Sequence, residues 1–290
     1  MNDNLNQQGS DGQSSGKQGS GQALPLSVAI ITKNEENNLP RLLDSLAPMN
    51  PAEIVVVDSG SADATANIAR KHKARVIEAD WPGYVEQKNR ALLACTQPWV
   101  LSLDADEPIS PRLAEKLLDL LGCDKADKDG YEIKRLTWYL GDWLRHIWYP
   151  EWRLRLVKRE KAEWRGDNIH ERLEVRGTTG RIDADIHHYS YNGVEDHFRR
   201  SIDYAKLGAQ ELNTRGEPFR WYKMIFSPFV RFIRLMIFRQ GWRDGWRGWI
   251  IAWSSMFSAF LKYAFLYEIQ QHQNRSKADK EKSNAGSHGD

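Results

Sequence analysis

The chain has 290 residues, and its 41 Lys and Arg residues against 39 Asp and Glu residues give a formal net charge of +2. Hydrophobic residues make up 41% and charged residues 28%, which excludes a wholly disordered or collagen-like protein. The two cysteines are too few for a disulfide scaffold, so we expect a reducing compartment or simply buried thiols.

Both ends of the chain are polar. The first 22 residues are rich in Gly, Gln, Ser and Asn, and we expect them to form a disordered tail. They contain no charged segment followed by an apolar stretch, so we expect no secretory signal there. Residues 270–290 are expected to form a second polar tail, frayed rather than folded.

Short apolar segments alternate with helical patterns along the first third of the chain. Expected strands cover residues 26–32, 53–58, 75–79 and 99–103, and expected helices cover residues 38–46, 62–72 and 83–95. This alternation predicts an α/β fold with a parallel, doubly wound sheet, in which nearly continuous apolar strands are covered on both faces. Ligands of such sheets bind beyond the carboxyl ends of the strands.

Polar clusters follow three of these expected strands, at residues 32–35, 58–63 and 104–107. Because Ser, Asn and Asp are good helix caps, capping is an alternative explanation, above all for the second cluster. In the third cluster, Asp104 and Asp106 flank one small residue directly after a buried strand, which concentrates negative charge. A divalent cation would offset this charge, and oxygen ligands suit Mg²⁺ or Mn²⁺.

Three stretches, in this order, resemble family 2 glycosyltransferases, which have the Rossmann-like GT-A fold of nucleotide-diphospho-sugar transferases. They read AIITKNEENNLPRLLDSL, IVVVDSGSADATANIA and QKNRALLACTQPWVLSLDADE. The resemblance implies roles for named residues: the nucleoside pocket at Thr32, Asn34, Glu35 and Asp58, a basic-plus-amide pair near the nucleotide at Lys88 and Asn89, and the metal and diphosphate site at Asp104 and Asp106. The expected cofactor is therefore a divalent cation, and the expected donor is a nucleotide sugar.

The second half of the chain resembles a narrower group, the bacterial lipopolysaccharide-core β-glucosyltransferases. The stretches that carry this resemblance read YPEWRLRL, NIHER, HHYSY and RQGWRDG. They imply a sugar transfer, with glucose from UDP-glucose as the expected donor, onto a lipopolysaccharide inner-core acceptor. Processive synthases of the family carry Gln-x-x-Arg-Trp, whereas here Asp244 follows Gln240–Arg243, which favours single sugar addition.

An inverting transfer needs a base near the acceptor hydroxyl. Glu171 is the first candidate, because the neighbouring Arg172 would keep it ionised, and Asp167 is the second. A structural ion pair between Glu171 and an arginine is the alternative. His170 has three alternative roles: a core residue, a metal ligand or a contact to the acceptor. Both histidines of HHYSY are expected to be structural.

The late part of the chain is basic and rich in tryptophan. Residues 215–247 hold eight basic and two acidic residues, a net +6 that leaves −4 on the remainder, and five tryptophans lie between residues 221 and 253. Such a segment favours an anionic partner, either a membrane surface or a nucleic acid. No nucleic-acid-binding motif is present, so we expect no nucleic acid partner.

Helical spacing predicts amphipathic helices in this segment. Ser227 and Pro228 are expected to be the N-cap and first residue of one helix. Residues 248–261 form an uncharged run of 14, which is shorter than the roughly 20 apolar residues that span a bilayer. We therefore expect these helices to lie on an anionic membrane surface, with ordinary core helices as the alternative.

The expected organisation is a disordered tail at 1–22, a GT-A domain at 23–215, a membrane-proximal helical segment at 216–269 and a polar tail at 270–290. Within the domain, residues 23–125 are expected to bind the nucleotide sugar and residues 126–215 the acceptor. The expected protein is an inverting, non-processive glycosyltransferase on the cytoplasmic face of the bacterial inner membrane, acting on a lipid-linked glycan. A transferase of the same fold acting on a polyprenyl phosphate or another cell-surface glycan is the alternative.

Overall fold

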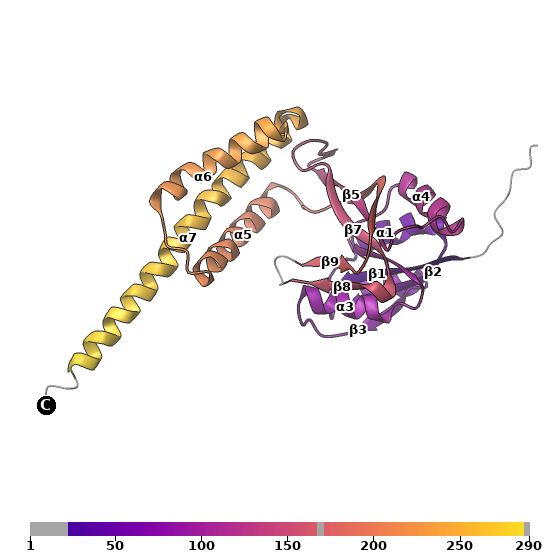
Figure 1. Cartoon of the computed structure of the whole chain (residues 1–290), viewed down its shortest axis with the longest axis horizontal. Coiled ribbons are helices and arrows are strands. Elements are labelled where there is room, and N and C mark those ends of the chain that lie inside the picture. The colour runs from indigo at the N-terminus through magenta and orange to yellow at the C-terminus, as the bar shows by residue number, and fades with distance from the viewer. Residues whose placement is uncertain (1–22, 167–170, 287–290) are drawn as a thin grey trace, which may run out of the picture.

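The computed structural model describes residues 23–166 and 171–286, and it contains an α/β body and a helical arm (Figure 1). The body holds all the strands, and the arm consists of the long helices of the C-terminal third. The two parts meet at one end of the sheet, where the chain leaves the last strand for the arm.

The first half of the body is the expected parallel sheet. Strands β1 (Leu24–Thr32), β2 (Pro51–Asp58), β3 (Arg75–Glu78) and β4 (Trp99–Asp104) lie in the order β3-β2-β1-β4, all parallel. They alternate with helices α1 (Leu39–Leu46), α2 (Thr65–Lys71), α3 (Tyr84–Ala94) and α4 (Pro111–Gly122). Short 3₁₀ turns follow at Ala47–Met49 and, later in the chain, at Arg159–Lys161. The prediction of these strands and helices is confirmed, with bounds shifted by up to three residues.

The second half of the chain widens this sheet. Strand β7 (Glu151–Lys158) pairs antiparallel with β4, β5 (Gly130–Tyr139) pairs antiparallel with β7, and β10 (Thr179–His188) pairs parallel with β5. A short β6 (Asp142–Trp143) pairs with β5, and β8 (Ala162–Arg165) and β9 (Arg172–Val175) form a separate hairpin. Because β5 and β10 run in the same direction as β4, their carboxyl ends reach the same edge of the sheet.

Alternation along β1 divides the core between the two faces of the sheet. Leu26, Val28 and Ile30 pack on one face with α1 and α4, while Ala29 and Ile31 pack on the other with α3 and the β8–β9 hairpin. Successive side chains of a strand point to opposite faces, so this strand is buried on both sides. The polar residues that follow these buried strands therefore lie together at the carboxyl edge of the sheet.

The arm contains α5 (Val194–Thr214), α6 (Trp221–Ile233), a π-helical turn η3 (Arg234–Phe238), a 3₁₀ turn η4 (Gly241–Asp244) and α7 (Gly245–Gly286). Helices α5 and α6 both pack along α7 (Figure 1). The expected division assigns α5 to the GT-A domain, but its packing along α7 places it in the arm. Among the described residues, one helical segment, Gly241–Ser276, is long and apolar enough to cross a membrane by length and composition.

Two expectations about this region are wrong in detail. Helix α6 begins at Trp221, so Pro228 lies inside the helix instead of starting it. An internal proline costs a helix about 3 kcal/mol or more, and packing of Phe232 against Trp249 and Trp253 of α7 offsets this cost. Helix α7 also continues through Gly286, because the Lys, Glu, Gln and Ala of the expected tail are strong helix formers.

A third apolar cluster joins the arm to the body. Tyr139 and Ile147 of the body pack with Met236, Ile251 and Ala252 of the arm. Gly241 of the arm lets the side chain of Ile147 approach, because a Cβ on Gly241 would lie 2.8 Å from Ile147 Cδ1. The arm is therefore packed against the body through a core of its own.

Candidate active site

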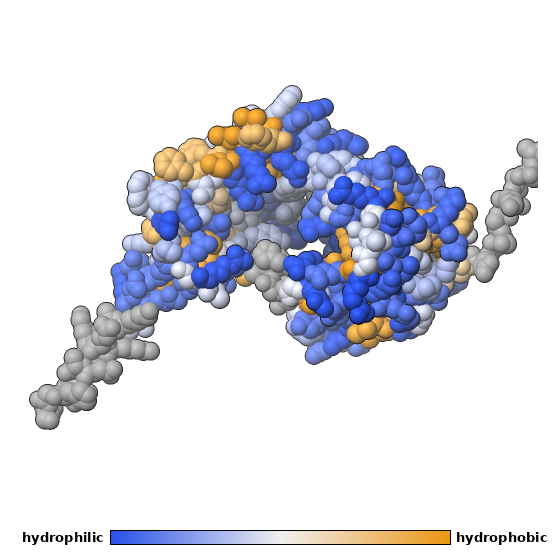
Figure 2. All heavy atoms as spheres, in the orientation of Figure 1, coloured by the Kyte–Doolittle hydropathy of each residue, from blue (hydrophilic) through white to orange (hydrophobic). Residues whose placement is uncertain are grey.

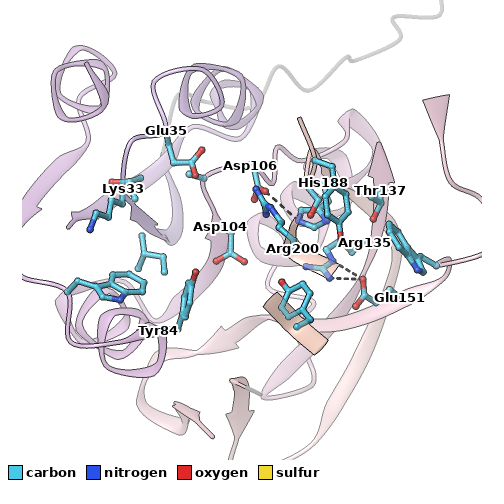
Figure 3. Close-up of a pocket in the computed structure, with 18 of the residues that line it drawn as sticks. Lys33, Glu35, Tyr84, Asp104, Asp106, Arg135, Thr137, Glu151, His188 and Arg200 are labelled. Atoms are coloured by element: carbon cyan, nitrogen blue, oxygen red, sulfur yellow. Dashed lines mark hydrogen bonds and ion pairs between the residues drawn. The ribbon is translucent and has the colours of Figure 1, made fainter. Parts of the chain in front are cut away.

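A cavity of about 810 Å³ lies beyond the carboxyl ends of β1, β4, β5 and β10 (Figure 3). Four of the residues singled out from the sequence line it: Thr32, Glu35, Asp104 and Asp106. The remaining lining residues are Ile31, Lys33, Trp81, Tyr84, Ala105, Arg135, Thr137, Trp148, Glu151, His188, Ser190, Tyr191, Arg200, Tyr204 and Arg239.

The turns after β1 and β2 are fastened to each other by side chains. Asp58 is buried and accepts hydrogen bonds from Thr32 Oγ1 at 3.0 Å and from the Ser61 amide at 2.9 Å. Asn34 has a left-handed backbone (φ 56°), and its Oδ1 accepts a hydrogen bond from the Ala62 amide at 2.8 Å. Asp58 and Asn34 thus shape the rim of the cavity without lining it. Their contacts are hydrogen bonds within and between the two turns and not helix caps, because the described residues give neither α1 nor α2 a side-chain N-cap bond.

Asp104 lies between two buried cations. Lys88 Nζ is 3.0 Å from Asp104 Oδ1, and Arg155 donates from Nη2 to Asp104 Oδ2 at 3.1 Å. Burial alone would raise the pKa of Asp104, but the charges of Lys88 and Arg155 outweigh it and hold this pKa well below its ordinary value. Asp104 is therefore an anion, and each of its two carboxylate oxygens already contacts a cationic side chain.

Asp106 has a different environment, because the charges around it are mostly negative. Burial raises the pKa of Asp106 to about 8, and the nearby carboxylates of Glu107 and Asp104 act in the same direction. Its Oδ2 lies 3.5 Å from His188 Nε2 (Figure 3). Burial lowers the pKa of His188 to about 3, so this imidazole is neutral at physiological pH.

These two side chains fit a divalent cation. A neutral imidazole beside a carboxylate that lacks a counter-charge is a typical donor set for such an ion. No group of three or more His, Cys, Asp or Glu side chains suited to a metal is present in the described ranges 23–166 and 171–286. Oxygens of a bound substrate would have to complete the coordination, as is common for Mg²⁺ sites with phosphate substrates.

The remaining residues predicted for the site lie close to Lys88. Glu171 Oε1 is 3.5 Å from Lys88 Nζ, although Glu171 does not line the cavity. Asn89 uses both ends of its amide on the backbone of Trp164, at 2.8 Å each, which joins α3 to β8. Asp167 and His170 lie outside the described residues.

Comparison with known proteins gives the family. The sequence profile described as glycosyl transferase family 2 matches residues 27–181. The lipopolysaccharide core biosynthesis glycosyltransferase LpsC of Rhizobium meliloti is 34% identical over 273 residues, which cover 88% of this chain and 97% of LpsC. The chain belongs to glycosyltransferase family 2. An uncharacterized glycosyltransferase of Rickettsia typhi is also similar, at 28% identity over 84% of this chain and 87% of its own.

Solved structures also resemble this family 2 glycosyltransferase over most of its chain. Glucosyl-3-phosphoglycerate synthase from Mycobacterium tuberculosis, in complex with phosphoglyceric acid, is 18% identical with a TM-score of 0.44, and the match covers 67% of this chain and 80% of that one. S. aureus TarS 1–349 is 18% identical with a TM-score of 0.42 over 81% of this chain and 80% of its own. The parallel-rich sheet and the family together confirm the predicted GT-A fold and glycosyltransferase activity.

The structure adds cavity residues that the sequence did not single out. Arg135 bridges two carboxylates, with contacts of 3.4 Å to Glu107 and 2.8 Å to Glu151. The aromatic pair of Trp81 and Tyr84 meets edge to face at 4.7 Å beside the first strand. The only available signal was the YPEWRLRL stretch, which the resemblance had marked without assigning a role to Glu151.

His188 is the clearest departure from expectation. The sequence analysis took both histidines of HHYSY as structural, and His187 does pack on Trp143, with ring centroids 4.4 Å apart. Successive residues of β10 point to opposite faces of the sheet, so His188 points into the cavity instead. Its Nδ1 is buried and has no hydrogen-bond partner among the described residues.

Proposed function

We propose that this glycosyltransferase is inverting and non-processive, and that it transfers glucose from UDP-glucose onto a lipopolysaccharide inner-core acceptor. The observation that carries the proposal is the pairing of Asp106 with neutral His188. Asp106 lies two residues beyond Asp104, which is paired with Lys88, at the sheet edge where donors bind. The acceptor class rests on the similarity to LpsC, which extends over nearly the whole length of both chains.

Asp106 and His188 would hold the divalent cation, Mg²⁺ or Mn²⁺. When bound, such an ion acts as a Lewis acid that stabilises negative charge on the departing diphosphate. Asp104, fixed by Lys88 and Arg155, would place its carboxylate beside the sugar nucleotide, where its constant negative charge balances the two buried cations. The aromatic rings of Trp81 and Tyr84 and the polar rim at Thr32 and Glu35 would receive the nucleoside.

Glu171 would be the base that takes the proton from the acceptor hydroxyl, with Asp167 as the second candidate. Arg172, expected to keep Glu171 ionised, instead pairs with Glu174, and the cation beside Glu171 is Lys88. Glu171→Gln should lower kcat about 100-fold, the usual size of general base catalysis, while leaving UDP binding intact. An undiminished rate would favour the alternative acceptor, a polyprenyl phosphate, because a phosphate nucleophile needs little base catalysis.

The helical arm would attach the enzyme to a membrane. Large apolar side chains are exposed along α6, the turns η3 and η4 and the start of α7. Figure 2 shows orange, hydrophobic spheres on the arm. We call these exposed side chains the apolar face of the arm, and they are Trp221, Tyr222, Ile225, Phe226, Phe229, Val230, Ile233, Ile237, Phe238, Trp242, Trp246, Trp249 and Trp253. Arg231 and Arg234 lie in the same segment, so both apolar insertion and attraction to anionic lipid are available.

Packing of α5 argues that α7 lies at the membrane surface and does not cross it. Only 28% of the most apolar window of α7 is buried, so most of it faces outward from the protein. Yet Ser258 of α7 donates to the Ser201 carbonyl of α5 at 3.0 Å, and α5 is rich in charged residues. A spanning α7 would carry these charges into the hydrocarbon, which costs several kcal/mol or more. We therefore propose peripheral attachment, on the cytoplasmic face of the inner membrane.

A donor screen tests the proposed function. The full chain is incubated with UDP-, GDP- and ADP-sugars, with Mn²⁺ or with chelator, and nucleotide release is measured. We expect release from UDP-glucose that needs the metal and falls at least about 100-fold in Asp106→Asn and His188→Ala. Asp183→Asn, at an exposed ion pair on the outer edge of the sheet, is the matched control and should release nucleotide like the parent. Equal release by the Asp106→Asn variant would refute the metal assignment.

A further inference from the structure

The arm contributes side chains to the cavity from outside the segment that the family profile matches. Arg200 and Tyr204 come from α5, and Arg239 directly follows η3, whereas the profile ends at residue 181. Arg200 and Tyr204 are four residues apart, so they lie on one face of α5. His197, one turn earlier, is buried against Tyr139 of the body, which turns this face of α5 towards the cavity.

Arg200 is held in a fixed direction. Its Nε donates to Asp196 Oδ1 at 3.1 Å, and its guanidinium lies 5.6 Å from the ring centroid of Tyr191. The ring of Tyr191 is in turn packed on His197 at 4.7 Å and on Trp148 at 5.9 Å. The bond to Asp196 uses Nε only, so it leaves the donors on both Nη atoms available to a ligand.

Two acids of the cavity have cations of their own. Asp104 pairs with Lys88 and Arg155, and Glu151 pairs with Arg135 and Arg153. Arg200 pairs with Asp196 through Nε, and its charge also acts on Glu35. Arg239 forms none of the ion pairs found among the described residues. Arg239 and the remaining donors of Arg200 therefore leave positive charge on the arm side of the cavity available to an anion.

We propose that Arg200 and Arg239 form an oxyanion subsite that binds a phosphate or carboxylate group of the acceptor. Arg239 directly follows Phe238, which is 77% exposed at the end of the apolar face of the arm. An acceptor that approaches along the membrane therefore meets Arg239 before it reaches Asp106 and His188. The rings of Trp148, Tyr191 and Tyr204 line the same side and would pack against its sugar. This inference rests on the proposed function, because it assumes a lipid-borne acceptor.

The test uses inorganic phosphate as the probe and isothermal calorimetry as the measurement. Phosphate is titrated into the full chain, both free and saturated with UDP and Mn²⁺. We expect the UDP-loaded parent to bind phosphate, and Arg200→Ala and Arg239→Ala each to weaken this binding about tenfold or more without changing UDP affinity. Arg199→Ala is the matched control, because Arg199 is the adjacent arginine of α5 and makes an equivalent i,i+4 pair with Glu195 on the exposed side.

Each outcome separates the two possible sources of the oxyanion. If phosphate competes with UDP and both variants weaken UDP binding, the subsite exists but serves the donor diphosphate. If the parent does not bind phosphate at all, or both variants bind phosphate and UDP as the parent and Arg199→Ala do, the subsite is refuted. A parent that binds phosphate at these arginines but no UDP would instead count against the proposed function.

Discussion

His197 shows how a single residue connects the arm to the body. Its Nδ1 accepts a hydrogen bond from the Tyr139 hydroxyl at 2.7 Å, and its Nε2 donates to Ser254 Oγ at 3.0 Å. The Ser254 hydroxyl donates to the Ile251 carbonyl, so only the neutral imidazole satisfies all three groups. Burial lowers the pKa of His197 to about 4, and the nearby charge of Asp196 opposes this shift without cancelling it.

This shift makes the stability of the protein depend on pH. In the unfolded chain the pKa of His197 returns to about 6.5. Between pH 6.5 and 4, His197 therefore binds a proton in the unfolded state but not in the folded state. The contribution of His197 to the free energy of unfolding should therefore be largest above pH 6.5 and should fall by about 3 kcal/mol as the pH drops to 4. Urea unfolding at a series of pH values measures this slope. His197→Gln should flatten it, and an unchanged slope in that variant would contradict the assignment.

At the residue scale, the sequence located the site but not the direction of its side chains. Asp104 and Asp106 were predicted because they end and follow a buried β-strand at the edge of the sheet where ligands bind. His188 and Asn89 could not be judged in this way. One residue of register on β10 decides whether a histidine faces the cavity, and a distant backbone segment at Trp164 decides what the Asn89 amide binds.

Among the elements, the turn η4 holds the loop after β6 in place. Asp244 is almost fully buried, and its carboxylate accepts hydrogen bonds from the amides of Arg145, His146 and Ile147 at 2.9, 3.2 and 2.8 Å. The imidazole of His146 lies 2.9 Å from the same carboxylate. The loop continues to Trp148 in the wall of the cavity, so η4 positions part of the active site.

Asp244→Ala should therefore destabilise both the contact between arm and body and the cavity wall. Leaving the part-buried amides of His146 and Ile147 without an acceptor costs about 1–3 kcal/mol each, so we expect a loss of about 3 kcal/mol in the free energy of unfolding. Asp142→Ala removes only an exposed carboxylate, 3.6 Å from Arg247, and is the matched control, with an expected loss of under about 1 kcal/mol. Comparable urea midpoints for the two variants would show that the carboxylate of Asp244 does not hold the loop.

Helices and strands could be predicted from the sequence where the local hydrophobic pattern agrees with the packing in the folded protein. Apolar runs bounded by turn residues predicted β1 to β4. Strands β1 and β4 contribute to the core on both faces of the sheet, while β3 is a partly exposed edge strand. The start of α6 was misplaced because Ser227-Pro228 is a good helix start locally, and only the contacts with α7 show that the helix begins at Trp221. Strand β5 pairs with β7 and β10, whose residues are far from it in the sequence. The alternation of apolar and polar residues along a strand does not show which other strand it pairs with.

For the molecule as a whole, the arm performs two tasks. It supplies Arg200, Tyr204 and Arg239 to the cavity, and it exposes its apolar face to the surroundings (Figure 2). The net charge of +6 over residues 215–247 adds attraction to an anionic surface. Membrane binding would therefore hold the arginines of the arm at the point where a lipid-borne acceptor enters.

Vesicle flotation tests this attachment. The parent should float with vesicles that contain anionic lipid and much less with neutral vesicles or at high salt, because each basic residue near the surface contributes about 1 kcal/mol that salt screens. Replacing Phe226 and Phe229, which are 59% and 58% exposed, by serine should weaken binding about tenfold or more, since two aromatic side chains no longer leave water. Leu93→Ser is the control, because Leu93 is 78% exposed but lies on α3 of the body. Equal loss of binding in this control would show that the apolar face of the arm does not direct the enzyme to the membrane. Equal flotation with neutral and anionic vesicles would show that its basic residues do not attract it to anionic lipid.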